Sequence, residues 1–271
     1  MLVSFFSLFV AVVFIQFIYY VIIFGKFSFA KPQSSTPKRI PISVIVCAKN
    51  EEENVKNFIP LLADQDYPQF EIVLIDDASS DGTLDVLEEY EKKYSNIKLV
   101  KVENNEAFWG NKKFALTLGI KAAKYEYLLF TDADCYPVSK DWITKMSSQF
   151  TQQKNIVLGY GAYEKIAGTF LNKLIRFETL LAATQMFSWA KIGKPYTGVG
   201  RNMAYKREEF FKVRGFMDHM KIRSGDDDLF INQAANGTNT TICFVQDSFT
   251  YSKPKTTFKE WFTQKRRHVS T

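Results

Sequence analysis

The sequence predicts an α/β domain, with a mostly parallel central sheet covered by helices, attached to an N-terminal transmembrane helix. An uninterrupted apolar run opens the chain, and after residue 41 short apolar segments alternate with helix-length amphipathic segments. Strands and helices that alternate in this way form βαβ units, whose parallel strands are buried on both faces. With 271 residues, 46% of them hydrophobic, the chain is long enough to bury one large core.

The apolar run, Leu2 to Phe24, contains no charged residue. As a helix that rises about 1.5 Å per residue, it is long enough to cross the roughly 30 Å of bilayer hydrocarbon. A secretory signal peptide is the alternative, because "FSFA" resembles a cleavage site. However, the run is longer than the usual apolar region of about 7–15 residues, and no Lys or Arg precedes it. We therefore expect residues 1–25 to remain as a single-pass anchor.

Basic residues follow the run but do not precede it, so the positive-inside tendency places the rest of the chain in the cytoplasm. Residues 26–41, which include "KPQSSTP", are expected to form a polar linker. The folded domain then occupies residues 42–271, with a first half over 42–135 and a second half over 136–271.

Composition narrows the possible functions. The formal net charge of +6 suits an anionic partner such as a nucleotide, a phospholipid surface or a nucleic acid. Three widely spaced cysteines give neither a disulfide framework nor a zinc pattern, and two histidines are too few for a His-rich metal site. The basic residues are spread along the chain without a recognition module, so nucleic-acid binding is not expected.

Four strands and three helices are expected in the first half of the domain. The strand-like segments are short and rich in β-branched or aromatic residues, and they cover 42–48, 71–76, 97–102 and 125–131. The helical segments between them cover 51–65, 81–94 and 111–124. Ligands of such sheets bind at the carboxyl ends of the strands, so the residues that follow each strand are the first candidates for a site.

The segment "DDASSDGTLDVLEE" follows the second strand and allows two interpretations. Counted from Asp77, it nearly matches a calcium-binding EF-hand loop, with oxygen-bearing residues at positions one, three, five and twelve and glycine at six. An EF-hand needs a helix before the loop, however, and the sequence there has the pattern of a strand. The second interpretation is an acidic turn in which Asp77 contacts a nucleoside, while the next helix is capped by Ser79, Ser80 or Asp81.

Asp132 and Asp134 close another strand, in "FTDADC". Two carboxylates one residue apart repel each other unless a cation lies between them. A divalent ion held by one or two carboxylates and by substrate phosphates is a common solution. A D-x-D pair also occurs in solvated loops, but its place beside "LIDDAS", at the end of a companion strand, favours a metal and nucleotide site.

The ordered set "SVIVCAKNEEENV", "VLIDDASSDGT", "LLFTDADC", "GRNMAY", "GDDDL" and "QKRRH" resembles the family 2 glycosyltransferases, inverting enzymes of GT-A fold that use nucleotide-diphospho-sugars. The similarity extends from about Ile42 to the end of the chain. It implies a Rossmann-like, nucleotide-sugar-binding half over 42–135 and an acceptor-binding half over 136–271. It also implies a divalent metal cofactor, Mn²⁺ or Mg²⁺, and a donor that is usually a UDP-sugar.

For the donor, the resemblance implies that Asp77 contacts the base, that Asp134 binds the metal and that Asp132 lies near the ribose or the waters of the metal. Further nucleotide-sugar contacts are implied for Ala48, Glu51, Lys112 and Arg267. Two of these keep a structural alternative. Glu51 also suits the first turn of a helix through the helix dipole, and Lys112 also suits a solvated helix face.

A general base is sought in "SGDDDLF", because an acceptor hydroxyl must lose its proton as it attacks the sugar. The family register, three residues before the leucine, selects Asp226, and a shift by one residue selects Asp227. Gly225 stands where the family pattern often has glutamate. Acids here also complement the dipole of the following helix. Three acids in one turn should raise at least one pKa by like-charge repulsion.

The acceptor side is expected to include Asn202 in "GVGRNMAY", and Gln264 and His268 in "QKRRH". The last motif has the spacing of the QxxRW motif of processive synthases, but His268 replaces the tryptophan, which argues against processive synthesis. Alternatively, "FKEWFTQKRRH" is an amphipathic basic helix on a membrane surface. Segment 170–193 is interpreted as a core helix, with an interfacial helix that receives a lipid-linked acceptor as the alternative.

Together these observations predict a membrane-anchored inverting glycosyltransferase, which moves a sugar from a metal-bound UDP-sugar to a hydroxyl of a glycan or lipid-linked acceptor. Two alternatives remain: a calcium-binding membrane module at 77–88, and a non-catalytic relative that binds nucleotide sugars. Calcium binding without nucleotide would favour the first, and nucleotide-sugar binding without transfer would favour the second.

Overall fold

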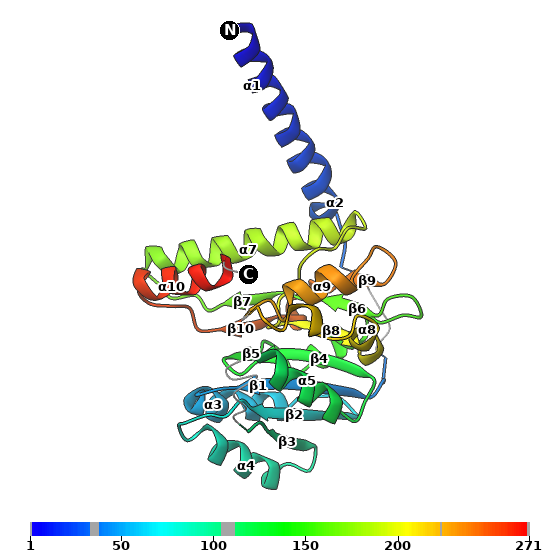
Figure 1. Cartoon of the computed structure of the whole chain (residues 1–271), viewed down its shortest axis with the longest axis vertical. Helices are drawn as coiled ribbons and strands as arrows, with labels where there is room; N and C mark the ends of the chain where they lie inside the picture. The colour runs from blue at the N-terminus through cyan, green and yellow to red at the C-terminus, as the bar shows by residue number, and fades with distance from the viewer. Residues whose placement is uncertain (1, 33–37, 104–111, 223, 270–271) are drawn as a thin grey trace.

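The computed structural model describes residues 2–32, 38–103, 112–222 and 224–269. Its centre is a seven-stranded sheet (Figure 1), whose strands in spatial order are β3 (Ile97–Lys101), β2 (Phe70–Asp76), β1 (Ile42–Ala48), β4 (Tyr127–Asp132), β8 (Met203–Lys206), β6 (Ile156–Leu158) and β9 (Thr240–Ile242). Strand β8 is antiparallel to its neighbours β4 and β6, and the other neighbouring pairs are parallel. The predicted mostly parallel α/β sheet is therefore confirmed.

The first half of the domain contains the predicted strands and helices, with ends that differ from the prediction by no more than two residues. The three helices are α3 (Glu52–Ala63), α4 (Thr83–Lys93) and α5 (Lys112–Ala122). Strand β1 lies between β2 and β4, and its parallel register places Ala48 beside Asp76 and Cys47 beside Asp132. The acidic turns that follow β2 and β4 therefore reach the same edge of the sheet.

Alternation along β1 separates two apolar clusters, one on each face of the sheet. Val44 and Val46 pack in one cluster with side chains of α3 and with Leu87 of α4. Ile45, which lies between them in sequence, packs in the other cluster with Leu116 of α5. This burial on both faces explains the continuous apolar sequence of β1 and fixes the position of the sheet edge that carries the acidic turns.

The second half of the domain adds a smaller sheet, in which β10 (Thr250–Ser252) lies between β5 (Cys135–Pro137) and β7 (Gly161–Tyr163). Because β5 begins directly after Asp134, this small sheet adjoins the D-x-D turn. The short helices of this half are α6 (Trp142–Ser147), α8 (Arg207–Lys212) and α9 (Asp228–Ala234), with single 3₁₀ turns at Met217–His219 and Gln246–Ser248.

The chain begins with one continuous helix over Leu2–Ser28, which combines α1 (Leu2–Phe17), a π-helical segment (Ile18–Phe24) and α2 (Gly25–Ser28). It extends away from the domain (Figure 1), and it is long and apolar enough to cross a membrane. Residues 26–28 of the expected linker are helical, and residues 33–37 of that linker lie outside the described residues.

Helix α7 (Phe170–Lys191) crosses the domain beneath the foot of the N-terminal helix (Figure 1), and Tyr19 of that helix contacts Trp189 of α7. Helix α10 (Phe258–Val269) is linked to α7 by an ion pair of 2.5 Å between Lys265 and Glu178. One face of α7 is buried, which confirms the core-helix interpretation for that face. The rest of α7 exposes large apolar side chains, including Phe170, Phe177 and Leu180.

Candidate active site

A cavity of about 770 Å³ opens at the edge of the sheet that carries the acidic turns. Its walls come from the ends of β1, β2 and β4, from the first residue of α5, from the turn before α9, and from α7 and α10. Most residues that the sequence indicated for the donor, the metal and the base line this cavity: Glu51, Asp77, Lys112, Asp132, Asp134, Asp226, Asp227 and Arg267.

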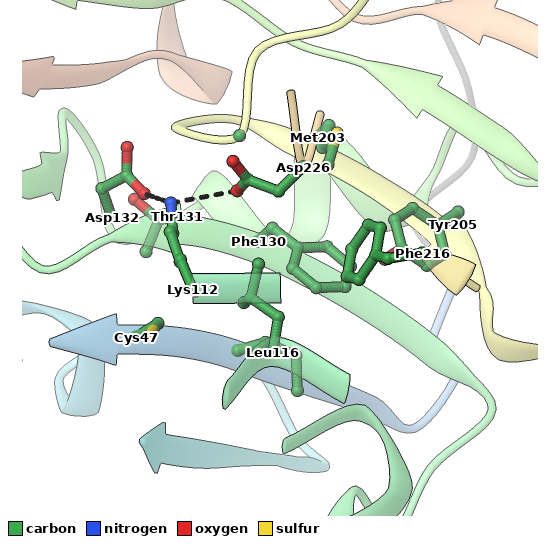
Figure 2. Close-up of a pocket in the computed structure, with 12 residues that line it drawn as sticks. Cys47, Lys112, Leu116, Phe130, Thr131, Asp132, Met203, Tyr205, Phe216 and Asp226 are labelled. Carbon is green, nitrogen blue, oxygen red and sulfur yellow. Dashed lines mark hydrogen bonds and ion pairs between the residues drawn. The ribbon is translucent and has the colours of Figure 1, made fainter. Parts of the chain in front are cut away.

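Lys112 joins the two groups of carboxylates in the cavity. Its ammonium nitrogen lies 2.8 Å from an oxygen of Asp132 and 3.1 Å from an oxygen of Asp226 (Figure 2). Burial opposes the charge of Lys112, but the two carboxylates outweigh it and raise the pKa of Lys112 well above its ordinary value. Burial likewise opposes the charge of Asp132, yet Lys112 holds the pKa of Asp132 below its ordinary value. Lys112 is thus a doubly paired counter-ion, with 36% of its side chain exposed.

The two base candidates have different surroundings. Asp227 accepts hydrogen bonds from the backbone N–H groups of Asp228, at 2.8 Å, and Gly200, at 2.7 Å, so both of its carboxylate oxygens hold the backbone. Asp226 points into the cavity toward Lys112 (Figure 2). Burial, together with the charges of Asp226 and Asp228, raises the pKa of Asp227 to about 7. The expectation that one acid of this turn has a raised pKa is confirmed.

Gly225 precedes this turn with a φ of +80°, in the left-handed region that glycine adopts without strain. A side chain with a Cβ atom would be strained there. This backbone requirement accounts for the glycine at a position where the family pattern often has glutamate.

The D-x-D turn offers a set of metal ligands. One ligand atom each from Asp132, Asp134 and Cys135 lie within 4.8 Å of one another. Burial and the charge of Asp132 raise the pKa of Asp134, whereas burial raises the pKa of the Cys135 thiol well above its ordinary value. The protonated thiol donates to an oxygen of Asp134 at 3.3 Å. The two carboxylates, with the repulsion between them, fit a hard divalent cation such as Mn²⁺ or Mg²⁺.

Asp77 lies at the end of the cavity that β2 forms. Its backbone N–H donates to the carbonyl of Ala48 at 2.9 Å, and its carboxylate lies 3.5 Å from the Lys49 ammonium. Burial raises the pKa of Asp77, and Lys49 offsets part of this effect. Glu51 also faces the cavity, and its carboxylate accepts a hydrogen bond from Asn54 at 2.6 Å at the start of α3.

The loop after Asp77 does not have the surroundings of an EF-hand. Strand β2 precedes it, and the glutamate at its twelfth position, Glu88, pairs instead with Lys101 at 2.5 Å. An oxygen of Asp81 accepts from the backbone N–H of Thr83 at 3.0 Å, at the first residue of α4. The N-cap position of α4 is held by Gly82, so none of the three residues that the sequence offered is the N-cap, and Asp81 bonds the helix from the position before it.

Asn202 is placed differently from the sequence expectation. It is fully buried, its amide oxygen accepts from the Trp142 indole N–H at 3.1 Å, and its amide nitrogen donates to the carbonyls of Tyr160 and Ser248. This placement corrects the expected acceptor contact, because the whole amide is used inside the protein. Asn202 instead holds the segment that precedes β8.

Two other expected residues lie outside the lining of the cavity. Ala48 is buried, and its carbonyl is used by Asp77 within the sheet. Gln264 donates to the Tyr163 hydroxyl at 3.2 Å, and Tyr163 itself lines the cavity. The side chain of His268 lies outside the described residues.

Arg201 and Tyr163 line the cavity but were not singled out from the sequence. Arg201 belongs to the quoted "GVGRNMAY" segment, where a single cation beside two glycines was the available signal. Tyr163 had no such signal, because its place at the cavity depends on the pairing of β7 with β10.

Comparison with known proteins identifies the fold and the family. The sequence profile described as "Glycosyl transferase family 2" matches residues 43–225. The chain belongs to this family. This glycosyltransferase is 29% identical over 238 residues to the "Probable glycosyltransferase YdaM" of Bacillus subtilis (strain 168), in a match that covers 85% of this chain and 55% of that protein.

A second relative is the "Poly(ribitol-phosphate) beta-glucosyltransferase" of Bacillus spizizenii, which is 32% identical over 120 residues. That match covers 44% of this chain and 18% of the relative. The chain thus spans about half the length of the first relative, 55%, and only 18% of the second.

Solved structures support the GT-A fold. The mannosyltransferase PcManGT from Pyrobaculum calidifontis, in complex with GDP-Man and Mn²⁺, superposes with a TM-score of 0.70 at 20% identity, over 97% of this chain and 72% of that one. S. aureus TarS 1-349, in complex with UDP-GlcNAc, superposes with a TM-score of 0.54 at 20% identity, over 85% of this chain and 66% of that one. The glycosyltransferase thus has the fold that its motifs predicted.

Proposed function

We propose that this glycosyltransferase moves a sugar from a nucleotide-diphospho-sugar, a UDP-sugar, to a hydroxyl of a glycan or lipid-linked acceptor, with inversion at the anomeric carbon. One observation carries the proposal: the ammonium of Lys112 contacts both Asp132 of the D-x-D pair and Asp226 of the base turn. The D-x-D pair on the donor side and the proposed general base Asp226 therefore share one cavity and one counter-ion, Lys112. The UDP-GlcNAc bound by TarS and the GDP-Man bound by PcManGT support a nucleotide-sugar donor.

On the donor side, Asp77 accepts a hydrogen bond from the nucleobase of the donor, and Asp132 lies nearer to the ribose. Lys112 and Arg267 offset the charge of the diphosphate, which a cationic side chain binds through charge-assisted hydrogen bonds. Glu51 also lines the cavity, and the charges of Asp134 and Asp132 act on it. The ion pair of Asp77 with Lys49 gives the β2 end of the cavity one hydrogen-bond acceptor and one donor for a base edge.

Asp134 and Asp132 would hold the divalent cation, Mn²⁺ or Mg²⁺. When bound, such an ion stabilises the negative charge of the departing nucleoside diphosphate as a Lewis acid. The protein prepares the two carboxylates in different ways, because Lys112 keeps Asp132 ionised and the Cys135 thiol orients Asp134.

On the acceptor side, Asp226 takes the proton of the acceptor hydroxyl as that oxygen attacks the anomeric carbon. The new glycosidic bond forms as the bond from the sugar to the diphosphate breaks on the opposite face, and this displacement inverts the anomeric centre. Asp227 supports the reaction indirectly, since its hydrogen bonds to Gly200 and Asp228 hold the turn in place.

The Leu2–Ser28 helix is proposed to anchor the enzyme in a membrane, with the catalytic domain in the cytoplasm. Exposed apolar side chains of α7, which lies at the foot of this helix, support a position near the membrane surface. Protease accessibility of a C-terminal tag in sealed inside-out and right-side-out vesicles tests the orientation. Cleavage only in right-side-out vesicles would contradict it.

A donor screen tests the function. The full chain in nanodiscs is incubated with Mn²⁺ and each common UDP- or GDP-sugar, and released nucleoside diphosphate and sugar transfer are measured. We expect turnover with a UDP-sugar and its loss in Asp134→Ala. Undiminished turnover in that variant would contradict the metal assignment.

Calorimetry with the same chain tests the alternatives. Mn²⁺-dependent UDP binding supports the transferase. Calcium binding that is independent of UDP would support a calcium-binding module, and UDP-sugar binding without turnover would support a non-catalytic relative.

A further inference from the structure

Arg201 is a cation of the cavity that the family motifs leave without a role. It lies in the turn before β8, and it lines the cavity with the carboxylates of the D-x-D turn. Its charge acts on both Asp132 and Asp134. Arg201 is therefore a further cationic side chain, in addition to Lys112 and Arg267, in the cavity where a diphosphate and its metal ion are proposed to bind.

The small sheet holds this side chain in one position. The guanidinium carbon lies 4.5 Å from the centre of the Tyr163 ring of β7, and one guanidinium N–H donates to the Ser252 hydroxyl of β10 at 3.0 Å. The Thr250 hydroxyl donates to the Arg201 carbonyl at 3.0 Å. A Cβ atom at Gly161 would lie 3.0 Å from the Arg201 Cβ and 3.3 Å from its Nε, so the absence of a side chain there leaves room for the arginine.

A guanidinium fixed beside two acids could serve as their counter-ion or as a binding group for an anion. Lys112 already supplies the counter-ion of Asp132 at 2.8 Å, and among the residues that the structure describes Arg201 forms no ion pair with Asp132 or Asp134 within 4.0 Å. A guanidinium has five N–H donors, and the contact with Ser252 uses one of them. The arrangement therefore favours the second role, in which Arg201 binds an anion that arrives with the substrate.

We propose that Arg201 binds the diphosphate of the donor directly and stabilises its charge as it leaves the sugar. This inference rests on the proposed function, because it assigns the residue to the donor of that reaction. An arginine fork matches two phosphate oxygens at once, and a cation held in place before the substrate arrives needs little reorganisation. Lys112 from α5 and Arg201 from the turn before β8 then reach the diphosphate from two different parts of the fold.

The test compares the affinities of UDP and uridine by calorimetry, with the full chain in nanodiscs and a saturating concentration of Mn²⁺. We expect Arg201→Gln to weaken UDP binding by about tenfold to a hundredfold, because a charge-assisted contact is lost. Uridine binding should be unchanged, since uridine has no phosphate. If Arg201 were only a counter-ion of the two acids, bound Mn²⁺ would offset their charge in its place, so UDP binding would not weaken, and that result would overturn the inference.

Two further variants keep the test decisive. Arg201→Lys retains the charge without the fork, so it should weaken UDP binding by a smaller factor, and it replaces Arg201→Gln if that variant fails to fold. Wild-type UDP affinity in Arg201→Lys and Arg201→Gln would overturn the inference. Arg214→Gln is the matched control, since Arg214 is exposed and pairs with Asp218, and it should leave UDP affinity unchanged. A wild-type chain that binds no nucleotide would instead refute the proposed function.

Discussion

The ammonium of Lys112 and the carboxylate of Asp226 form an ion pair of 3.1 Å across the cavity. The same ammonium also holds Asp132, so the proposed base is paired with a cation before any donor arrives. A bound diphosphate would compete for this ammonium, because phosphate oxygens form strong charge-assisted hydrogen bonds with it. The binding of the donor and the ion pairing of the proposed general base Asp226 are therefore linked through Lys112.

The first prediction concerns this link. Lys112→Gln should weaken UDP binding by about tenfold through the lost charged contact, and it should lower kcat/KM by at least about a hundredfold because the base loses its partner as well. Lys121→Gln, at an exposed position of the same helix, is the control and should behave as the wild type. Unchanged UDP affinity in Lys112→Gln would refute the diphosphate role.

The second prediction separates the two base candidates. Asp226→Asn should keep UDP affinity and lower kcat by about a hundredfold to ten-thousandfold, the usual contribution of a general base. Asp227→Asn should retain more activity, since both carboxylate oxygens of this residue hold the backbone of Gly200 and Asp228. Both variants are compared by single-turnover transfer. The assignment is wrong if Asp227→Asn is the inactive variant and Asp226→Asn turns over normally.

The third prediction follows from the raised pKa of Asp227, which is about 7 in the folded protein. An unfolded aspartate has a pKa of about 3.9, so between these values the folded state holds a proton that the unfolded state releases. By linkage, this residue makes the free energy of unfolding rise as the pH falls from about 8 toward 4. In Asp227→Asn this contribution disappears.

Thermal melts of the wild type and Asp227→Asn at pH 5 and pH 8 measure the effect. The Tm of the wild type minus that of the variant should be larger at pH 5 than at pH 8. Other titrating groups are common to both proteins and largely cancel in this difference. An equal difference at the two pH values would show that Asp227 is ionised throughout.

Local patterns predicted that the residues expected on the donor side lie together, and most of these residues line one cavity. Asp77 and the D-x-D pair follow strands whose apolar sequence is visible on its own, and parallel strands bring such ends to one edge. Residues whose roles depend on distant contacts could not be predicted in this way. Asn202 has the motif of an acceptor residue, yet a hydrogen bond from Trp142, 60 positions away in sequence, fixes it in the interior.

Arg201 is the opposite case, a residue of the cavity that local sequence patterns did not indicate. Its position depends on Ser252, 51 residues later, and on Tyr163, which reaches the cavity only because β7 pairs with β10. Neither partner has a sequence signal of its own. The placement of this cation therefore arises from the assembly of the small sheet.

The fourth prediction concerns Gln264, which reaches the cavity through Tyr163. Its amide donates to the Tyr163 hydroxyl at 3.2 Å, and the same ring lies 4.5 Å from the guanidinium carbon of Arg201. If the hydrogen bond positions the ring, Gln264→Ala and Tyr163→Phe should each weaken UDP binding by about two- to tenfold, the range of one neutral hydrogen bond.

The double variant Gln264→Ala with Tyr163→Phe shows whether the two residues act through their shared hydrogen bond or independently of each other. Because both single changes remove the same bond, UDP binding in the double variant should be no weaker than in either single variant. Gln153→Ala, at an exposed turn, controls for a general effect of losing a glutamine. Additive losses would mean that Gln264 acts on the substrate by another route, such as the direct acceptor contact that its motif first indicated.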